Sequence, residues 1–386
     1  MNLTMNRPAA RVAGHPVRQR GFTLIELLIG ITVSLLGLVA VSAMLVTFTQ
    51  KRAGITQTMS AQDNGVMALY RLEHDIAHAG YGLMPLQVCT TINQGPSNFF
   101  PVTIVDGGSN SDALIVKYVD SVSGAPGTEM VKAGTSMTVS QYNIPSSAGF
   151  QVGDYVVATA LAPNCTVTQL TSTFTCGIPA AGTPTIHDCT SCTTRACATP
   201  ATSQVVSQSR PTESVGFAET LTQTTNTGFL ANLGPLGAGY SEHQYQVSSA
   251  LNALEVAEYQ LNTQTYANAN RLVDDIVFLK AQYGITNGAA GSTTVSQWVS
   301  AASFTITAAN VSRVIAIRLG VVARSPQRES QAIELKDSTQ TQTVLPAIST
   351  IGSAVTYTPP AADAQHFRYR TYTTVVPLRS VIWIAT

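Results

Sequence analysis

The longest apolar stretch of the chain lies near its start, at residues 22–48, where Glu26 is the only ionisable side chain. As a helix, this stretch would be roughly 40 Å long, enough to cross a bilayer core of about 30 Å. Four arginines precede it and only two basic residues follow it closely, which predicts that the start of the chain stays in the cytoplasm. We therefore predict a single span of the membrane, with the rest of the chain exported.

A second pattern, at residues 59–79, has the period of an amphipathic helix. Its apolar positions recur at spacings of three and four residues: Val66, Leu69, Leu72 and Ile76. The glycines of Gly80-Tyr81-Gly82 suit a helix C-terminus. We predict one long helix over 22–80, with an apolar half in the membrane and an amphipathic half against a head. Gly54 and Gly65 are predicted weak points, each costing about 1 kcal/mol relative to alanine.

Beyond residue 83 the pattern changes to short strands and turns. In residues 313–324 the alternation of apolar and polar positions predicts a half-buried strand. Other predicted strands lie at Ala113–Val119, Tyr155–Val157, Phe367–Tyr372 and Val381–Ile384, and residues 253–262, which are ambiguous, favour a strand over a helix. The predicted fold class is α+β, with the long N-terminal helix packed on a head, residues 81–386, that is mainly antiparallel β-sheet.

Residues 141–230 differ in composition from the rest of the head. They hold only six charged residues, are rich in Thr, Ser and Pro, and contain five of the six cysteines. Such a segment has few apolar side chains to bury, so we predict a loop-rich insertion tied by disulfides.

The distribution of charge differs between the start of the chain and the rest, and it bears on whether the chain binds nucleic acid. Residues 1–21 carry four arginines and no acid, and the remainder has 17 basic and 21 acidic residues. A chain with this balance is a poor candidate for neutralising many phosphates. We therefore do not expect residues 22–386 as a whole to bind DNA, although local contact with DNA stays possible.

Two ordinary explanations of the apolar stretch each fail to account for one of its features. A secretory signal peptide usually has an apolar core of about 7–15 residues, shorter than residues 22–48. A plain membrane anchor fits the length but gives no reason for Glu26, because a carboxylate within an apolar segment is costly and usually functional. The remaining ordinary explanation is that Glu26 lies near the membrane surface and reaches the lipid headgroups.

The segment Gly21-Phe22-Thr23-Leu24-Ile25-Glu26 resembles the signal of type IV prepilins. That signal has a basic leader, a glycine before the cut, an aromatic first residue and a glutamate as fifth residue of the mature chain. The resemblance implies a leader, residues 1–21, that a prepilin peptidase removes between Gly21 and Phe22. It also implies N-methylation of Phe22 and a role for Glu26 in filament assembly.

Further segments resemble the PilW family of minor pilins more narrowly. They are Gln62–Gly65, Arg71–Ile76, Ala79–Gly82, Arg271–Ile276, Gln282–Gly284, Ala323–Pro326 and the closing residues from Arg370 to Leu378 and Arg379. The resemblance is strong over residues 18–82 and scattered over 271–384. Leu83 and Ser380 depart from the family pattern, which has an aromatic-Gly-Cys run and an asparagine there.

The PilW resemblance implies a structural protein of a type IV pilus that acts in pilus assembly or initiation, and so in twitching motility, attachment or DNA uptake. Its expected partners are the prepilin peptidase, the major pilin and other minor pilins, the inner-membrane assembly machinery and the membrane itself. The expected location is the inner membrane, with a single span, a cytoplasmic N-terminus and a periplasmic head, and afterwards the pilus on the cell surface.

The six cysteines are the chief candidates for cross-links: Cys89, Cys165, Cys176, Cys189, Cys192 and Cys197. An even number of cysteines after a membrane span favours disulfides formed in an oxidising compartment, although six cysteines allow about 15 pairings. Cys189, Cys192 and Cys197 with His187 have spacings that also suit a metal knuckle, but export favours disulfides. Cys89 is the expected partner of whichever cysteine is left over.

No group of residues favours catalysis, and we expect neither an enzyme nor a cofactor or metal. His74-Asp75-Ile76-Ala77-His78 places two histidines one helical turn apart, but it lacks the glutamate of a zinc-protease helix. Asp274-Asp275 lacks the acidic loop of a calcium site.

Two other functional classes stay open. The chain could be a pseudopilin of a type II secretion system, which shares the N-terminal signal, or a pilus-tip adhesin whose cysteine-rich insertion meets a surface. The length of the chain after Gly21 and the later family segments favour the pilus.

Overall fold

The computed structural model describes residues 22–83, 86–93, 95–119, 128–129, 141–144, 151, 153–161, 164–170, 175–180, 183–188, 203–209, 229–235, 237–288, 292–329, 339–348 and 351–385. The chain divides into two compact units, Met1–Thr56 and Gln57–Thr386. Helix α1, Leu24–His78, contributes residues to both units. The predicted leader, residues 1–21, lies outside the described residues.

In the first unit, α1 is long and apolar enough to cross a membrane, and none of this part is buried within the structure. Its hydroxyl groups donate hydrogen bonds to carbonyl oxygens three or four residues earlier in the same helix. The donors are Thr32, Ser34, Ser42, Thr47 and Thr49. These bonds matter because a hydroxyl facing lipid finds no water to bond. The polar groups of this part of α1 are therefore compatible with an apolar environment.

The end of α1 agrees with the prediction from the sequence. The helix ends at His78, and Gly80 has φ of +80°, a conformation that favours glycine. The Gly80 N–H donates to the carbonyl of Lys117 at 2.7 Å. A Cβ atom at Gly80 would come within 2.5 Å of Ser380 Oγ, so glycine is required here by space as well as by conformation.

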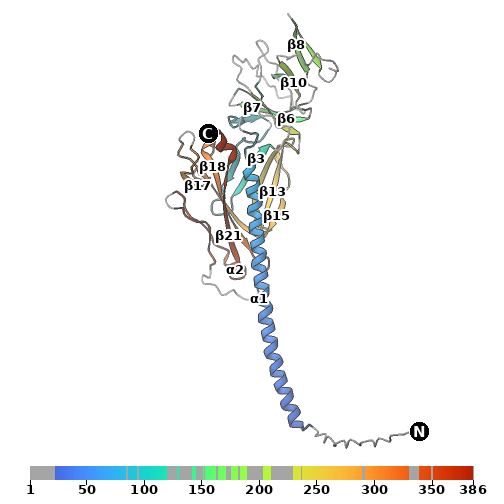
Figure 1. The fold of residues 1–386 in the computed structure, drawn as a ribbon, viewed down its shortest axis with the longest axis vertical. Coiled ribbons are helices and arrows are strands. Elements are labelled where there is room, and N and C mark those ends of the chain that lie inside the picture. Colours follow the sequence, from blue (N-terminus) through green and yellow to red (C-terminus); the bar gives the residue numbers. More distant parts are fainter. Residues whose placement is uncertain are drawn as a thin grey trace, which may run out of the picture. The chain divides into compact units, whose positions relative to one another are not determined.

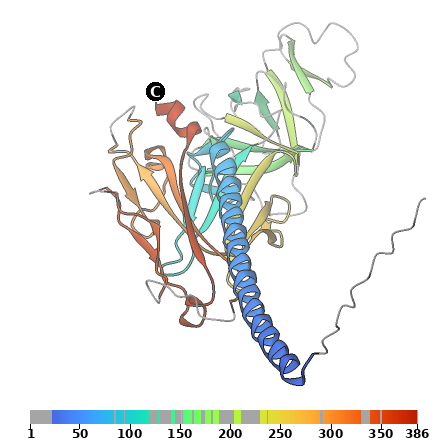
Figure 2. The ribbon, with the colours of Figure 1, turned by 60° about the horizontal axis from the view of Figure 1, so that its bottom comes forward.

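Two antiparallel sheets of the second unit enclose its part of α1 (Figure 1). One sheet has the order β14-β13-β12-β3-β2, with β15 also paired to β13. Its strands are β2 (Val102–Val105), β3 (Ala113–Val119), β12 (Tyr240–Ser248), β13 (Ala253–Gln260), β14 (Thr265–Tyr266) and β15 (Asn270–Asp274). The other sheet has the order β17-β16-β18-β21, with β16 (Ile276–Ile285), β17 (Gln297–Val299), β18 (Val314–Arg324) and β21 (Tyr369–Pro377). It is drawn in orange to red in Figure 2.

A third sheet forms from residues 91–235 and has the order β4-β11-β6-β7-β10-β8-β9, with β1 paired to β7 and β5 to β10. Its strands are β1 (Thr91–Asn93), β4 (Thr128–Glu129), β5 (Gln141–Ile144), β6 (Asp154–Leu161), β7 (Asn164–Leu170), β8 (Thr175–Ala180), β9 (Thr183–Asp188), β10 (Ser203–Ser209) and β11 (Phe229–Pro235). Among the described pairings only β1 with β7 is parallel. The mainly antiparallel head is therefore confirmed.

The remaining elements are short. A hairpin pairs β19 (Gln342–Leu345) with β20 (Val355–Tyr357). A 3-10 turn, η3 (Val311–Arg313), precedes β18, and α2 (Ala361–Ala364) and α3 (Arg379–Ala385) flank β21.

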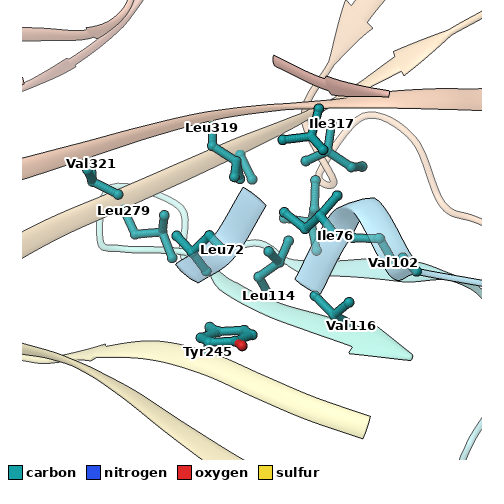
Figure 3. Close-up of a cluster of buried hydrophobic side chains, with 14 of the residues drawn as sticks. Leu72, Ile76, Val102, Leu114, Val116, Tyr245, Leu279, Ile317, Leu319 and Val321 are labelled. Carbon is teal, nitrogen blue, oxygen red and sulfur yellow. The ribbon is translucent and has the colours of Figure 1, made fainter. Parts of the chain in front are cut away.

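The main core of the head is built around α1. Leu72 and Ile76 are fully buried and lie between Ile317 and Leu319 of β18 and Leu114 of β3 (Figure 3). The predicted apolar stripe is only partly right, because Val66 is 54% exposed. The buried face consists mostly of small residues: Ala61, Gly65, Ala68, Leu72, Ile76 and Ala79. Small side chains let the helix backbone come close to the sheets. The buried face therefore contains fewer large apolar side chains than the stripe predicted from periodicity.

Gly65 marks the closest approach of α1 to the second sheet. A Cβ atom there would lie 2.2 Å from the ring of Tyr372 on β21, closer than real side-chain contacts allow. The low helix propensity of glycine predicts a weak point at Gly65. In the structure, the missing side chain of Gly65 makes room for the Tyr372 ring.

We expect Gly65→Ala to lower the free energy of unfolding of the head by about 1–3 kcal/mol, because the added methyl displaces the Tyr372 ring. Thermal unfolding of the full chain in detergent measures the change. Gly37→Ala is the matched control, since a Cβ there meets nothing within 4 Å. In a Tyr372→Leu background, Gly65→Ala should lose its cost. Destabilisation that persists in that background would contradict the steric explanation.

Strand β18 is buried on both faces and is not half-buried as predicted. One face, including Ile317 and Leu319, packs on α1. The other face, including Val322, is covered by Val344 and Leu345 of the β19–β20 hairpin. Arg318 is also covered and donates to the carbonyl of Pro346 at 2.5 Å. The alternation identified the strand but not the hairpin, which comes from later in the chain.

One further prediction needs correction. Residues 381–384 belong to α3 and not to a strand: the N–H groups of Val381 and Ile382 both donate to the carbonyl of Leu378. An apolar run this short does not distinguish the two structures by its periodicity. Within residues 141–230, the described segments are mostly strands, which threonine favours. The loop-rich insertion stays a prediction, because much of this range lies outside the described residues.

Candidate assembly site

The start of α1 holds the residues that the motif selects. Phe22 and Thr23 precede the helix, and Glu26 lies in its first turn. Phe22 is 82% exposed within the chain, and the Glu26 side chain is also exposed. Gly21 lies outside the described residues.

Thr23 and Glu26 are bonded to each other at the helix start. The Glu26 N–H donates to Thr23 Oγ1 at 3.3 Å, and the Thr23 hydroxyl donates to Glu26 Oε2 at 3.4 Å. The bond from the Glu26 N–H is the half of a capping box in which the Thr side chain caps the helix, whereas the Glu26 carboxylate accepts from the Thr23 hydroxyl and not from its backbone N–H. The pilin motif does not single out Thr23, but the Thr-x-x-Glu spacing is its signal in the sequence. Glu26 therefore has a local structural role besides any role between subunits.

One exposed face of α1 runs from Glu26 toward the middle of the apolar stretch and is only shallowly hollowed. The residues of this face are Phe22, Glu26, Leu27, Gly30, Ile31, Ser34, Leu35 and Leu38. A Cβ atom at Gly30 would meet nothing within 4 Å. An apolar face that ends at a single carboxylate suits an apolar helix that carries a positive charge at its end.

Asp75 lies off the apolar stripe of α1, yet only 13% of its side chain is exposed. It turns toward the first sheet, where its Oδ2 lies 2.6 Å from His243 Nδ1 and accepts a hydrogen bond from the Tyr245 hydroxyl at 2.5 Å. Burial by itself raises the pKa of Asp75, but these hydrogen bonds and the nearby His243 hold that pKa below its ordinary value. Asp75 thus ties α1 to β12, and we find no catalytic arrangement around it.

The other polar residues that the sequence singled out, His78, Asp274 and Asp275, also have partners close by in the structure. His78 Nδ1 lies 2.7 Å from the carbonyl oxygen of His74, one turn earlier. Asp274 pairs with Arg271, and Asp275 pairs with Arg324. Among the residues that the structure describes, no three His, Cys, Asp or Glu side chains gather as metal ligands.

One disulfide joins two of the predicted cysteines. Cys89, just before β1, is bonded to Cys165 on β7, and both are buried. Cys176 lies on β8, where its side chain is not described, and Cys189, Cys192 and Cys197 lie outside the described residues.

Comparison with known proteins gives two family matches. Residues 17–42 match the prokaryotic N-terminal methylation motif, and residues 244–380 match the family described as Type IV Pilus-assembly protein W. Among solved structures, the type IV-like pilin TTHA1219 from Thermus thermophilus aligns with 83% of this chain and 97% of its own, at 11% identity and a TM-score of 0.35. No protein of curated function matches the sequence.

The methylation motif, which covers Phe22 and Glu26 at the start of an apolar helix, defines the chain as a type IV pilin-like protein. The match over residues 244–380 covers strands β13 to β21 of the head. Over these residues the chain is similar to the PilW family of type IV pilus-assembly proteins.

Proposed function

We propose that this minor pilin takes part in assembling or initiating a type IV pilus, and through the pilus supports twitching motility, attachment or DNA uptake. A prepilin peptidase cuts the chain after Gly21, the inner membrane holds α1 with the head in the periplasm, and the assembly machinery then brings the subunit together with the major pilin and other minor pilins.

The observation that carries this proposal is the single carboxylate, Glu26, at the end of an exposed apolar face of α1. Cutting after Gly21 creates an α-amine on Phe22, one helical turn from Glu26. In a filament core both charges leave water, and an unpaired buried charge costs several kcal/mol. A pair between Glu26 of one subunit and the Phe22 amine of the next satisfies both charges and sets the axial register between subunits.

Processing gives the first test. We expect Gly21→Val to leave an uncut precursor in the inner membrane, because a β-branched side chain does not let the backbone enter the tight peptidase site as glycine does. Immunoblotting of membrane fractions separates precursor from mature chain. Gly30→Val, another glycine near the start of the chain, is the control for general effects on expression. A Gly21→Val chain of mature size would place the cut elsewhere.

Deletion tests the function itself. A strain without this chain is expected to lose sheared surface pili and to regain them when the intact gene is returned. Secretion through a type II system is measured in the same strain. Loss of secretion with normal pili would assign the chain to the secretion system. Normal pili with reduced attachment alone would favour the tip adhesin.

A further inference from the structure

Lys117 is the most deeply buried lysine among the described residues, with 1% of its surface exposed. It lies on β3, and its ε-amino nitrogen is 3.7 Å from Glu242 Oε1 on β12. Burial lowers the pKa of Lys117, although Glu242 opposes this effect. The neutral form of the Lys117 amine is therefore more favoured in this environment than it would be in water. A neutral amine is a nucleophile.

The side-chain amide of Asn98 lies directly against this amine. Lys117 Nζ is 2.9 Å from Asn98 Oδ1 and 2.8 Å from the Asn98 backbone oxygen. Since a carbonyl bond is about 1.23 Å long, the amine nitrogen is within about 4 Å of the amide carbon, Cγ. Asn98 precedes Phe99, which is fully buried and packs edge-on against Tyr240. The amine is therefore buried, and the amide that it contacts is half-buried.

The amide oxygen has a donor that would stabilise negative charge. The Phe100 N–H donates to Asn98 Oδ1 at 3.1 Å. When an amine adds to Cγ, charge develops on Oδ1, and a fixed backbone N–H is the group that stabilises such an oxyanion. On the other side of the amide, Asn98 Nδ2 lies 3.3 Å from Ser97 Oγ.

Glu242 is placed to carry the proton. Its two carboxylate oxygens accept hydrogen bonds from the hydroxyls of Tyr240 and Tyr266, each at 2.5 Å, and the residue is 2% exposed. These two bonds fix the carboxylate beside Lys117. A carboxylate fixed beside the nucleophile, which itself contacts the Asn98 amide, is the arrangement of a general base that later acts as a general acid.

We propose that Lys117 and Asn98 form an intramolecular amide cross-link. Nζ of neutral Lys117 adds to Cγ of Asn98, and Glu242 takes a proton from the nitrogen. Glu242 then returns that proton to Nδ2, the bond between Cγ and Nδ2 breaks, and one ammonia leaves. One C–N bond forms, one C–N bond breaks, and no oxidant or other reactant is consumed.

Lys280 provides the internal contrast. It is also buried, and its Nζ lies 2.5 Å from Asp112 Oδ1 and 2.8 Å from the carbonyl oxygen of Gly108. The hydrogen bonds of its amine go to a carboxylate and a backbone carbonyl, and none to a side-chain amide. Lys280 forms a buried ion pair with Asp112. Lys117 forms such a pair with Glu242 and also contacts the side-chain amide of Asn98. A purely structural lysine at position 117 would behave as Lys280 does.

Peptide mapping of the purified full-length chain tests the cross-link. After reduction, trypsin should fail to cut at Lys117, because an acylated lysine is not recognised, and should release residues 72–132 as one peptide, lighter by one ammonia than its sequence. Lys280 should be cut normally. A protease that cuts at Asp106 and Asp112 should leave the fragments that hold Asn98 and Lys117 joined.

The variants locate the chemistry. Lys117→Arg and Glu242→Gln should both lack the ammonia deficit, and Glu242→Gln should be cut at Lys117. Lys280→Arg should keep the cross-link. A wild-type peptide cut at Lys117 with its full sequence mass would overturn the proposal. So would an ammonia deficit without joined fragments, which would indicate a change at an asparagine alone. The wild-type result decides even if a variant fails to fold.

Discussion

Glu26→Gln is expected to be cut and inserted into the membrane normally, yet to be absent from sheared pili. Glutamine has nearly the shape of glutamate and keeps an oxygen that accepts the hydrogen bond of Thr23 Oγ1. It removes only the negative charge. Because the Phe22 amine would then enter the filament core unpaired, at a cost of several kcal/mol, incorporation should fall by more than tenfold. Immunoblots of membrane and sheared-pilus fractions give the two quantities.

Thr23→Ala is the matched control for the helix cap at Thr23. It should cost about 1 kcal/mol at the helix start, because the cap is lost, while the Glu26 charge remains. We expect this variant to enter pili. If Glu26→Gln entered pili and Thr23→Ala did not, Glu26 would act through the helix cap. Normal incorporation of both variants would leave Glu26 as a residue that reaches the lipid headgroups.

Replacing the disulfide is expected to have the largest effect on stability. Cys89 and Cys165 are 76 residues apart, and constraining a loop of this length in the unfolded chain stabilises a fold by about 4 kcal/mol in the chain-entropy treatment. The double variant Cys89→Ala and Cys165→Ala should lose about this much free energy of unfolding, measured by chemical denaturation of the full chain in detergent.

Reduction provides the control for the disulfide experiment. Reducing agent should destabilise the wild-type chain and leave the double variant less affected. The alanines also avoid burying hydroxyl groups, which serines would do at these two buried positions. A loss of less than about 1 kcal/mol would show that the unfolded chain is held together in other ways.

The helix and the site at its start were the most predictable parts of the molecule. The apolar run, Glu26 and Gly80 can each be interpreted from the residue itself and its neighbours in the sequence. The bounds of α1 therefore differ from the prediction by only two residues at each end. The buried face of α1 was less predictable, because Ala61, Gly65 and Ala68 face the sheets on account of their small size. Periodicity of large apolar side chains does not detect such a face.

Contacts between distant residues were beyond the sequence. Asp75 reaches His243 and Tyr245 across 168 and 170 positions, and these residues carry no shared motif. The same holds for Lys117, Asn98 and Glu242. Strand pairing places Lys117 opposite Glu242 in the register of β3 and β12, and Asn98 comes from the segment between β1 and β2. The second buried face of β18 likewise depends on a hairpin from later in the chain.

The hydroxyl groups along α1 bear on the energetics of leaving the membrane. Each of Thr32, Ser34, Ser42, Thr47 and Thr49 keeps its hydrogen bond inside the helix, whatever surrounds it. Transfer of this part of the helix from lipid to a packed bundle therefore exchanges one apolar contact surface for another without breaking a polar contact. The exchange is nearly balanced along most of the stretch. The direction of transfer is then decided at the one place where solvation changes sharply, the first helical turn.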